Sequence, residues 1–189
     1  MRTIYKQIDK LPKKYISKKL KEFLKEDCPS KDFTSLGLYK STLIRCNIEA
    51  GEPLLFVGKD IIKEGFKKEK ILFFVKEGSQ AKKGETLCTI EGEAYSILKK
   101  ERVVLNLIQR LSGIASLTNK YVEKMKNSNI SILDTRKTTP GLRTMEKFAV
   151  YIGGGKNHRL NLSTSILIKD NHIKIISNLC LYIQRIKKK

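Results

Sequence analysis

Paired cysteines, long apolar runs and acidic residues are all scarce in this sequence of 189 residues. Its cysteines, Cys28, Cys46, Cys88 and Cys180, stand far apart, form no C-x-x-C pair and have no nearby histidine that could complete a zinc tetrad. The spacing therefore argues against a structural zinc site. It predicts core thiols in a protein of the reducing cytosol.

Long apolar segments are missing from both the N-terminus and the interior of the chain. The first fifteen residues, MRTIYKQIDKLPKKY, lack the apolar core of a signal peptide. Runs such as Ile71 to Val75 are far too short to cross a bilayer. We therefore expect a cytoplasmic protein with no membrane partner.

The shortage of acidic residues gives the chain a large positive charge. Lysine and arginine number 39 against 19 aspartates and glutamates, which makes the net charge +20. Such a charge can indicate nucleic acid or a polyanionic substrate as partner. The lysines, however, are spread along the whole chain, and no aromatic residues are interleaved with them in a groove-binding pattern. We therefore expect no nucleic-acid partner and attribute most of the excess charge to a compositional bias.

The first hundred residues read as one small domain of helix and strands. Apolar residues at helical spacing after Pro12 predict a helix over 13–27. Alternating or continuous apolar residues predict strands over 44–48, 54–57 and 71–75, and residues 77–92 resemble a hairpin with glycines at both bends. Near Lys99 the spacing of the apolar residues changes from that of strands to that of a long helix. We therefore divide the chain into domains 1–100 and 101–189.

The second half of the chain alternates helices with strands that end in charged residues. A long amphipathic helix from about Lys99 is followed by a strand over 130–134, a helix that ends at Gly153, a strand over 166–168 and a final helix over 176–186. This alternation is typical of an α/β fold whose site lies at the carboxyl ends of parallel strands. The charged loops after the two strands would then share one face.

Cations gather in the loops that follow these two strands. Arginine grips a carboxylate or phosphate through two hydrogen bonds, and lysine adds a point charge, so both together suit a substrate with several anionic groups. The alternative is that each cation forms an ordinary ion pair with Asp134, Glu146 or Asp170. Asp170 could also help to hold a magnesium ion through water and phosphate oxygens. The candidate cations are Arg136, Lys137, His158, Arg159 and Lys169.

The glycine-rich stretch GGGKNHR at 153–159 fits neither common nucleotide motif. Val150 stands where a P-loop needs its first glycine, and Asn157 follows the lysine where serine or threonine is required. His158 replaces the last glycine of the dinucleotide fingerprint. The two histidines of the chain, His158 and His172, are also too few and too far apart to predict a histidine metal site.

Four long motifs stand out along the chain: EDCPSKDFTS (26–35), ERVVLNLIQRLSGIASLT (101–118), LDTRKTTPGLRTMEKFAV (133–150) and GGGKNHRLNLSTSILIKDNHI (153–173). In their order and spacing they resemble the quinolinate phosphoribosyltransferase family, and the resemblance covers about residues 10–176. The resemblance implies an N-terminal open α/β sandwich followed by an α/β barrel of the TIM type. It implies transfer of a phosphoribosyl group from phosphoribosyl pyrophosphate to quinolinate with magnesium, which gives nicotinate mononucleotide, carbon dioxide and pyrophosphate on the route to NAD.

The resemblance also assigns roles to individual residues. Arg136, Lys137, His158, Arg159 and Lys169 match the family's cationic pocket for the two quinolinate carboxylates and the phosphoribosyl donor, with Lys137 as the catalytic residue. Asn171 and His172 match the motif on the donor side. Arg102 matches an arginine that the family's partner subunit inserts into the neighbouring site, which implies a homodimer.

Family members are longer than this chain, so the resemblance implies a C-terminally truncated, incomplete barrel. Thr164 also stands where the motif commonly has an acidic residue. A second hypothesis therefore stays open, in which the chain is a catalytically impaired remnant that acts only as an assembly module.

Overall fold

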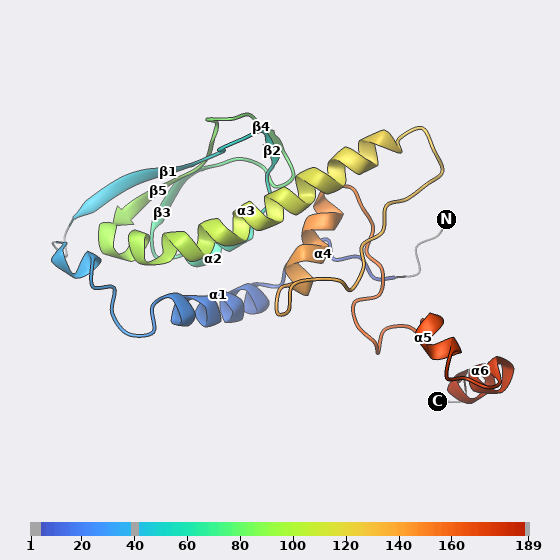
Figure 1. Cartoon of the computed structure of the whole chain (residues 1–189). Helices are drawn as coiled ribbons and strands as arrows, with labels where there is room; N and C mark the ends of the chain where they lie inside the picture. The colour runs from blue at the N-terminus through green and yellow to red at the C-terminus, as the bar shows by residue number, and fades with distance from the viewer. Residues whose placement is uncertain (1–4, 39–41, 188–189) are drawn as a thin grey trace. The chain divides into compact units, whose positions relative to one another are not determined.

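The computed structural model describes residues 5–38 and 42–187 of the chain, which fall into two compact units, Met1–His158 and Arg159–Lys189 (Figure 1). We describe each unit by itself. The elements of the first unit are α1 (Lys13–Asp27), η1 (Ser35–Gly37), β1 (Leu43–Glu49), β2 (Leu54–Leu55), α2 (Lys59–Gly65), β3 (Lys70–Phe74), β4 (Gln80–Ala81), β5 (Thr86–Glu93), α3 (Ala94–Lys124) and α4 (Arg143–Ile152). The second unit contains α5 (Asp170–Ile173) and α6 (Leu179–Lys187).

Helix α1 begins where Pro12 places the chain in an extended conformation. The carbonyl of Pro12 accepts hydrogen bonds from the backbone N–H groups of Tyr15 and Ile16 at 2.9 and 3.1 Å. Ile16 and Leu20 then turn one face of the helix into the core. The predicted helix over 13–27 is confirmed.

The main sheet is antiparallel, in the order β1-β5-β3, and it confirms the predicted strands near 44–48 and 71–75. The predicted hairpin over 77–92 is wrong, because β4 pairs with β2 whereas β5 lies between β1 and β3. The turn between β4 and β5 explains the difference. Gly84, in the left-handed region at φ 80°, donates its N–H to the carbonyl of Ala50 at 2.7 Å, and Ala50 donates to Glu85 at 3.0 Å. These bonds hold the turn beside the end of β1, so the chain passes from the small sheet into the large one.

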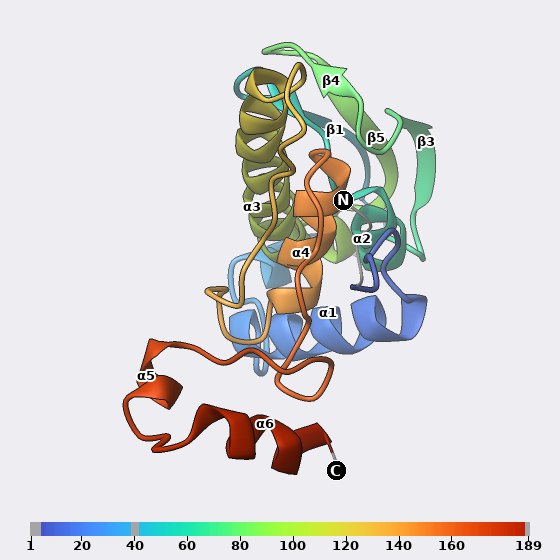
Figure 2. The ribbon, with the colours of Figure 1, turned by 90° about the vertical axis from the view of Figure 1, so that its right-hand side faces the viewer.

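The long helix α3 runs along the curved sheet, with α1 below it, and α4 lies alongside it (Figures 1 and 2). Val104, Leu107, Ile108, Leu111 and Ala115 are buried, as the predicted amphipathic helix requires. The helix begins earlier than predicted, before Lys99. The proposed domain division at 100/101 therefore falls inside one continuous helix, and it stays a prediction.

Helix α4 packs its apolar face against α3 and ends at Gly153. Met145 and Ala149 are fully buried, which confirms the predicted helix. Gly153 lies so close to α3 that a Cβ atom there would come within 2.5 Å of the carbonyl oxygen of Ala115. The backbone of Ala115 therefore leaves no room for a side chain at this position.

The two strands predicted for the second half differ from the structure. The segment 130–134 forms only a single parallel bridge, between Leu133 and Lys156. No strand forms over 166–168, where Ile166 is 63% exposed, because no partner strand is present among the described residues of this unit. The final helix is confirmed as α6, although it starts at Leu179 instead of 176.

The four cysteines are free thiols in different surroundings. Cys88 is fully buried on β5, and burial raises the pKa of its thiol to about 12. Cys180 is exposed, so the expectation of core thiols is right for Cys88 and wrong for Cys180. Within residues 5–38 and 42–187, the structure contains no helix that combines the length and apolar character of a membrane span.

Candidate functional site

The parallel bridge between Leu133 and Lys156 brings two segments of the first unit side by side. The N–H of Asp134 donates to the carbonyl of Lys156 at 3.0 Å, and the N–H of Lys156 donates to the carbonyl of Ile132 at 2.8 Å. Both segments run in the same direction. The loop that starts at Asp134 and the residues that follow Lys156 therefore leave this short ladder at the same end.

Asp134 is the centre of a buried polar network at this end. Its Oδ1 accepts bonds from the ammonium group of Lys147 and from the backbone N–H of His158, the latter at 2.8 Å. Its Oδ2 accepts a bond from the side-chain amide of Asn157 at 2.8 Å. Lys147, from α4, is only 1% exposed and also donates to the carbonyl of His158 at 3.1 Å. A buried ion pair is tolerated when further hydrogen bonds satisfy its remaining polar atoms, as they do here.

The N-terminal segment of the chain closes this network from another side. The side-chain oxygen of Asn157 accepts a bond from the backbone N–H of Ile8 at 2.7 Å, and the side-chain oxygen of Gln7 accepts one from the N–H of Asn157 at 2.7 Å. The ring of Tyr5 lies against the imidazole of His158, with 4.3 Å between ring centroids. Residues 5–8 thus help to fix the backbone and the ring of His158.

A second set of contacts shapes the far end of the loop. Arg110 of α3 forms an ion pair with the buried Glu146 of α4, with its Nη2 2.6 Å from Oε1. The other oxygen of Glu146 accepts a bond from the N–H of Thr139 at 3.2 Å, and Arg143 donates to the hydroxyl of Thr138 at 3.0 Å. The two threonines therefore anchor the loop to the start of α4.

Among the predicted site residues, the structure brings Arg136, Lys137 and His158 to the same end of the ladder. Arg136 is half-buried and Lys137 is exposed. Within the described part of the chain, neither side chain forms an ion pair or a hydrogen bond, because Asp134 and Glu146 are occupied by other cations. The alternative that these cations are ordinary ion pairs of Asp134 and Glu146 is therefore wrong for Arg136 and Lys137.

Arg102 lies on α3, at the exposed surface of the first unit. It forms no ion pair among residues 5–38 and 42–187.

The remaining predicted residues belong to the second unit. Arg159 donates to the carbonyl of Ser165 at 2.8 Å, which bends the segment between them into a loop. The backbone N–H of Lys169 donates to the Nδ1 atom of His172 at 3.0 Å, so His172 caps the short helix α5, and Asn171 lies exposed within it. Lys169 and His172 thus form one turn instead of the end of a strand.

Two important residues were missed by reasoning from the sequence. Lys147 lies between apolar positions of a helix, a place that the sequence alone assigns equally well to solvent. Asn157 was considered only as a mismatch to a P-loop. A signal did exist, since a carboxylate, a lysine and an asparagine in neighbouring predicted elements can satisfy one another when buried.

Candidate metal ligands are sparse around these residues. Throughout the described ranges, no three histidine, cysteine, aspartate or glutamate residues lie together in a group that could hold a metal ion. Asp170 is exposed on α5 and would meet a metal only together with oxygen atoms from a ligand.

Two family models match successive parts of the chain. The model of the quinolinate phosphoribosyl transferase N-terminal domain matches residues 32–112, and the model of the C-terminal domain matches residues 114–189. Together they cover most of the chain, including the ladder and the loop that starts at Asp134.

Curated relatives and solved structures carry related names. A probable nicotinate-nucleotide pyrophosphorylase [carboxylating] of Bacillus subtilis is 45% identical over 162 residues, which cover 84% of this chain and 56% of the relative. A protein of the same name from Methanocaldococcus jannaschii is 39% identical over 175 residues, 87% of this chain and 59% of the relative. The nicotinate-nucleotide pyrophosphorylase structure from Francisella tularensis matches with a TM-score of 0.89 and 32% identity, over 97% of this chain and 67% of that one. The chain thus spans little more than half the length of these curated relatives.

Proposed function

Because the chain belongs to the quinolinate phosphoribosyltransferase family, we propose that it binds quinolinate and phosphoribosyl pyrophosphate and takes part in phosphoribosyl transfer with decarboxylation. The products would be nicotinate mononucleotide, carbon dioxide and pyrophosphate, on the route to NAD. The Bacillus subtilis relative carries the name of this activity.

One observation supports the binding part of this proposal most directly. Arg136 and Lys137 present two positive charges at the end of the ladder, and the nearby carboxylates of Asp134 and Glu146 are already bound to other cations. Unpaired cations favour an anionic ligand, because each charge-assisted hydrogen bond that they form contributes about 1.5–3 kcal/mol when shielded from water. Quinolinate, with two carboxylates on one ring, has the matching charge.

The residues of the loop would divide the work between positioning and charge stabilisation. Arg136 and His158 would hold the quinolinate carboxylates, so that the pyridine nitrogen lies in line with the anomeric carbon of the donor. Lys137 would stabilise the pyrophosphate as it leaves an oxocarbenium-like ribose. For Arg159 and Lys169, in the second unit, the same roles are proposed from the family resemblance alone. Attack by the ring nitrogen makes that nitrogen cationic, and it can then accept the electrons released with carbon dioxide.

The donor would arrive with magnesium bound to its phosphates, so the ion enters as part of the substrate. Its charge would add to that of Lys137 on the leaving group. Asp170 would contribute through water, and Asn171 and His172 would lie on the donor side. The Nδ1 atom of His172 accepts a hydrogen bond from the N–H of Lys169, which restrains the imidazole ring.

Arg102 would act in the site of a second copy of the chain. Its guanidinium is exposed and free of acidic partners among the described residues. A homodimer would therefore be the functional form, and size-exclusion chromatography with light scattering measures its mass.

Calorimetric titration with quinolinate at low salt tests the site. We expect the variant Arg136→Ala plus Arg159→Ala to bind about tenfold to a hundredfold more weakly than wild type. The matched control, Arg45→Ala plus Arg185→Ala, removes the same charge from β1 and α6 and should bind like wild type.

Equal affinity in wild type and in the Arg136/Arg159 variant would overturn the proposed site. Release of carbon dioxide on addition of phosphoribosyl pyrophosphate and magnesium is measured with the same proteins. Binding of quinolinate without turnover would restrict the proposal to substrate binding, whereas a dimer that binds neither substrate would favour a role in assembly only.

A further inference from the structure

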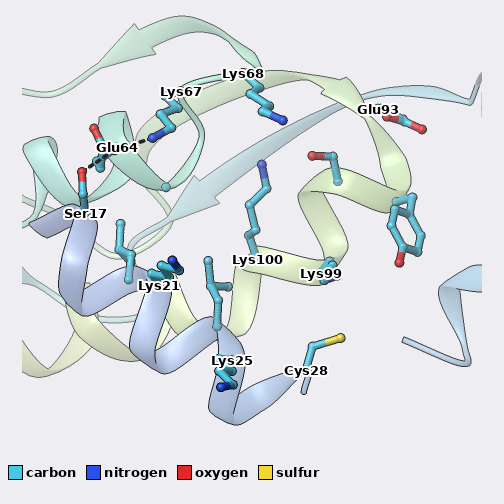
Figure 3. Close-up of a pocket in the computed structure, with 15 residues that line it drawn as sticks. Ser17, Lys21, Lys25, Cys28, Glu64, Lys67, Lys68, Glu93, Lys99 and Lys100 are labelled. Carbon is cyan, nitrogen blue, oxygen red and sulfur yellow. Dashed lines mark hydrogen bonds and ion pairs between the residues drawn. The ribbon is translucent and has the colours of Figure 1, made fainter. Parts of the chain in front are cut away.

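A pocket of about 770 Å³ lies in the first unit (Figure 3). Its lining contains no residue of the loop that holds Arg136. Its walls come from α1, from the end of α2 and the turn after it, and from the start of α3. Leu20, Leu24 and Tyr95 supply apolar surface to it. This volume falls within the range of small-molecule sites.

Lysine dominates the charged lining of this pocket. Figure 3 shows lysines from all three walls around one concavity. Two carboxylates, those of Glu64 and Glu93, also line the pocket. Glu64 is already engaged, because its Oε1 accepts hydrogen bonds from Ser17 and Lys67, both at 2.7 Å. The lining lysines are Lys21, Lys25, Lys67, Lys68, Lys99 and Lys100.

Most of these lysines lack an acidic partner. Lys100 is held by Glu69 at 2.6 Å. Lys21, Lys25 and Lys68 form no ion pair with any residue that the structure describes. Several like charges without counterions in one concavity repel one another, and an anion that enters the pocket relieves this repulsion.

The compositional bias of the chain does not explain this concentration. The lining holds six lysines and two glutamates, an excess of four positive charges. In four other pockets of the first unit, the net charge of the lining residues ranges from −2 to +1. The lysines are therefore gathered at this pocket and are not spread evenly over every hollow.

We propose that this lysine pocket binds a small polyphosphate, inorganic or carried on a small organic group. Lysine ammonium groups bind phosphate as point charges, and a chain of phosphates can contact ammonium groups on several walls at once. The pocket shares no lining residue with the proposed quinolinate site. This inference therefore does not depend on the proposed function.

Titration calorimetry with sodium tripolyphosphate at low salt tests the lysine pocket. The variant Lys21→Gln plus Lys25→Gln plus Lys68→Gln should bind at least about tenfold more weakly than wild type. The control Lys14→Gln plus Lys18→Gln plus Lys120→Gln removes the same charge from exposed positions of α1 and α3 outside the pocket, and it should bind like wild type.

Two further titrations separate this site from other cations. The variant Arg136→Ala plus Lys137→Ala should leave tripolyphosphate affinity at the lysine pocket unchanged, even if quinolinate binding is lost. Orthophosphate should bind wild type at least about tenfold more weakly than tripolyphosphate, because it spans fewer lysines. Equal losses in the pocket and control variants, or equal affinity for the two phosphates, would overturn the proposal.

Lysine labelling of the wild-type protein keeps the test independent of how the variants fold. Tripolyphosphate should slow acylation of Lys21, Lys25 and Lys68 severalfold, read by mass spectrometry, and leave Lys14 and Lys18 unchanged. Uniform protection of all five lysines would show diffuse charge instead of a site.

Discussion

The ammonium group of Lys147 is buried with the carboxylate of Asp134, and removal of one partner leaves the other charge without compensation. We predict that Lys147→Met lowers the free energy of unfolding by about 3–5 kcal/mol. Urea denaturation followed by circular dichroism measures the change.

A control for this prediction is Lys156→Met, at a neighbouring lysine that is only half-buried and bonds the hydroxyl of Ser131 at 3.0 Å. Lys156→Met should lower the free energy of unfolding by less than about 1 kcal/mol. If the two variants unfold at the same urea concentration, the network around Asp134 does not stabilise the fold.

Glu77 allows a prediction about pH. Burial raises the pKa of its carboxyl, although the N–H groups of Gly58 and Lys59 donate to its oxygens and lower the pKa in part. The folded state then holds this proton more tightly than the unfolded state. The contribution of Glu77 to stability therefore falls as the pH rises above the ordinary pKa of a glutamate, near 4.5. We predict that Glu77→Gln gains stability relative to wild type between pH 4 and pH 7, measured by urea denaturation at each pH.

Glu91 supplies a control of opposite sign. The hydrogen bond from Arg45 lowers the pKa of Glu91, so its contribution is present above the ordinary pKa and is lost as pH falls. Glu91→Gln should therefore lose stability relative to wild type over the same rise in pH. Parallel slopes for the two variants would contradict both assignments.

At the scale of single residues, the sequence shows which side chains are charged, but it does not show which of them are buried or which partners they meet. Arg136 and Lys137 could be proposed as anion ligands because a loop rich in cations is visible in the sequence. The pairing of Asp134 with Lys147 was not predictable, since it depends on how α4 packs. Which cations stay free is decided by which acids the fold has already occupied.

The packing of α3 against α4 depends on the absence of a side chain at Gly153. A Cβ atom there would lie 2.5 Å from the carbonyl oxygen of Ala115 and 2.8 Å from the Cβ atom of Thr118. We predict that Gly153→Ala lowers the free energy of unfolding by about 2 kcal/mol or more, because backbone must move. Thermal unfolding measures this change.

Gly113 is the matched control, since it lies within α3 and a Cβ atom there meets no atom within 4 Å. Gly113→Ala should stabilise the protein by about 0.5–1 kcal/mol through helix propensity. A Gly153→Ala variant as stable as Gly113→Ala would show that the two helices do not approach as closely as described.

Elements with their own periodicity were predicted well, whereas pairing between elements was not. Helices α1 and α4 follow from apolar spacing. The partner of β4 could not be predicted from the sequence. The backbone hydrogen bond between Gly84 and Ala50 redirects the chain, and the pattern of side chains does not reveal such a bond. The segment 166–168 has the composition of a strand, but composition supplies no partner.

The whole molecule carries an excess of positive charge that its ion pairs do not balance. The net charge is +20, and pairs such as Arg45–Glu91 and Lys126–Glu123 are exposed and contribute little. Mutual repulsion of the lysines destabilises the folded state and is screened by salt, since the Debye length shortens to about 10 Å at 0.1 M.

We therefore predict that the melting temperature rises by roughly 2–5 °C between 10 mM and 200 mM sodium chloride. Differential scanning calorimetry measures the rise. Sucrose at matched osmolality, which does not screen charge, is the control. A melting temperature that falls with sodium chloride would show that attractive pairs outweigh the repulsion.

The bonds from Gln7 and Ile8 to Asn157 join parts of the chain about 150 residues apart. During synthesis residues 5–8 leave the ribosome well before Asn157 is made, so their bonds to Asn157 cannot form until then. Contacts of such long range close large loops and form slowly. The imidazole of His158 would consequently take up its position beside Tyr5 only after translation has passed most of the chain, and the buried network around Asp134, which Asn157 completes, would form equally late.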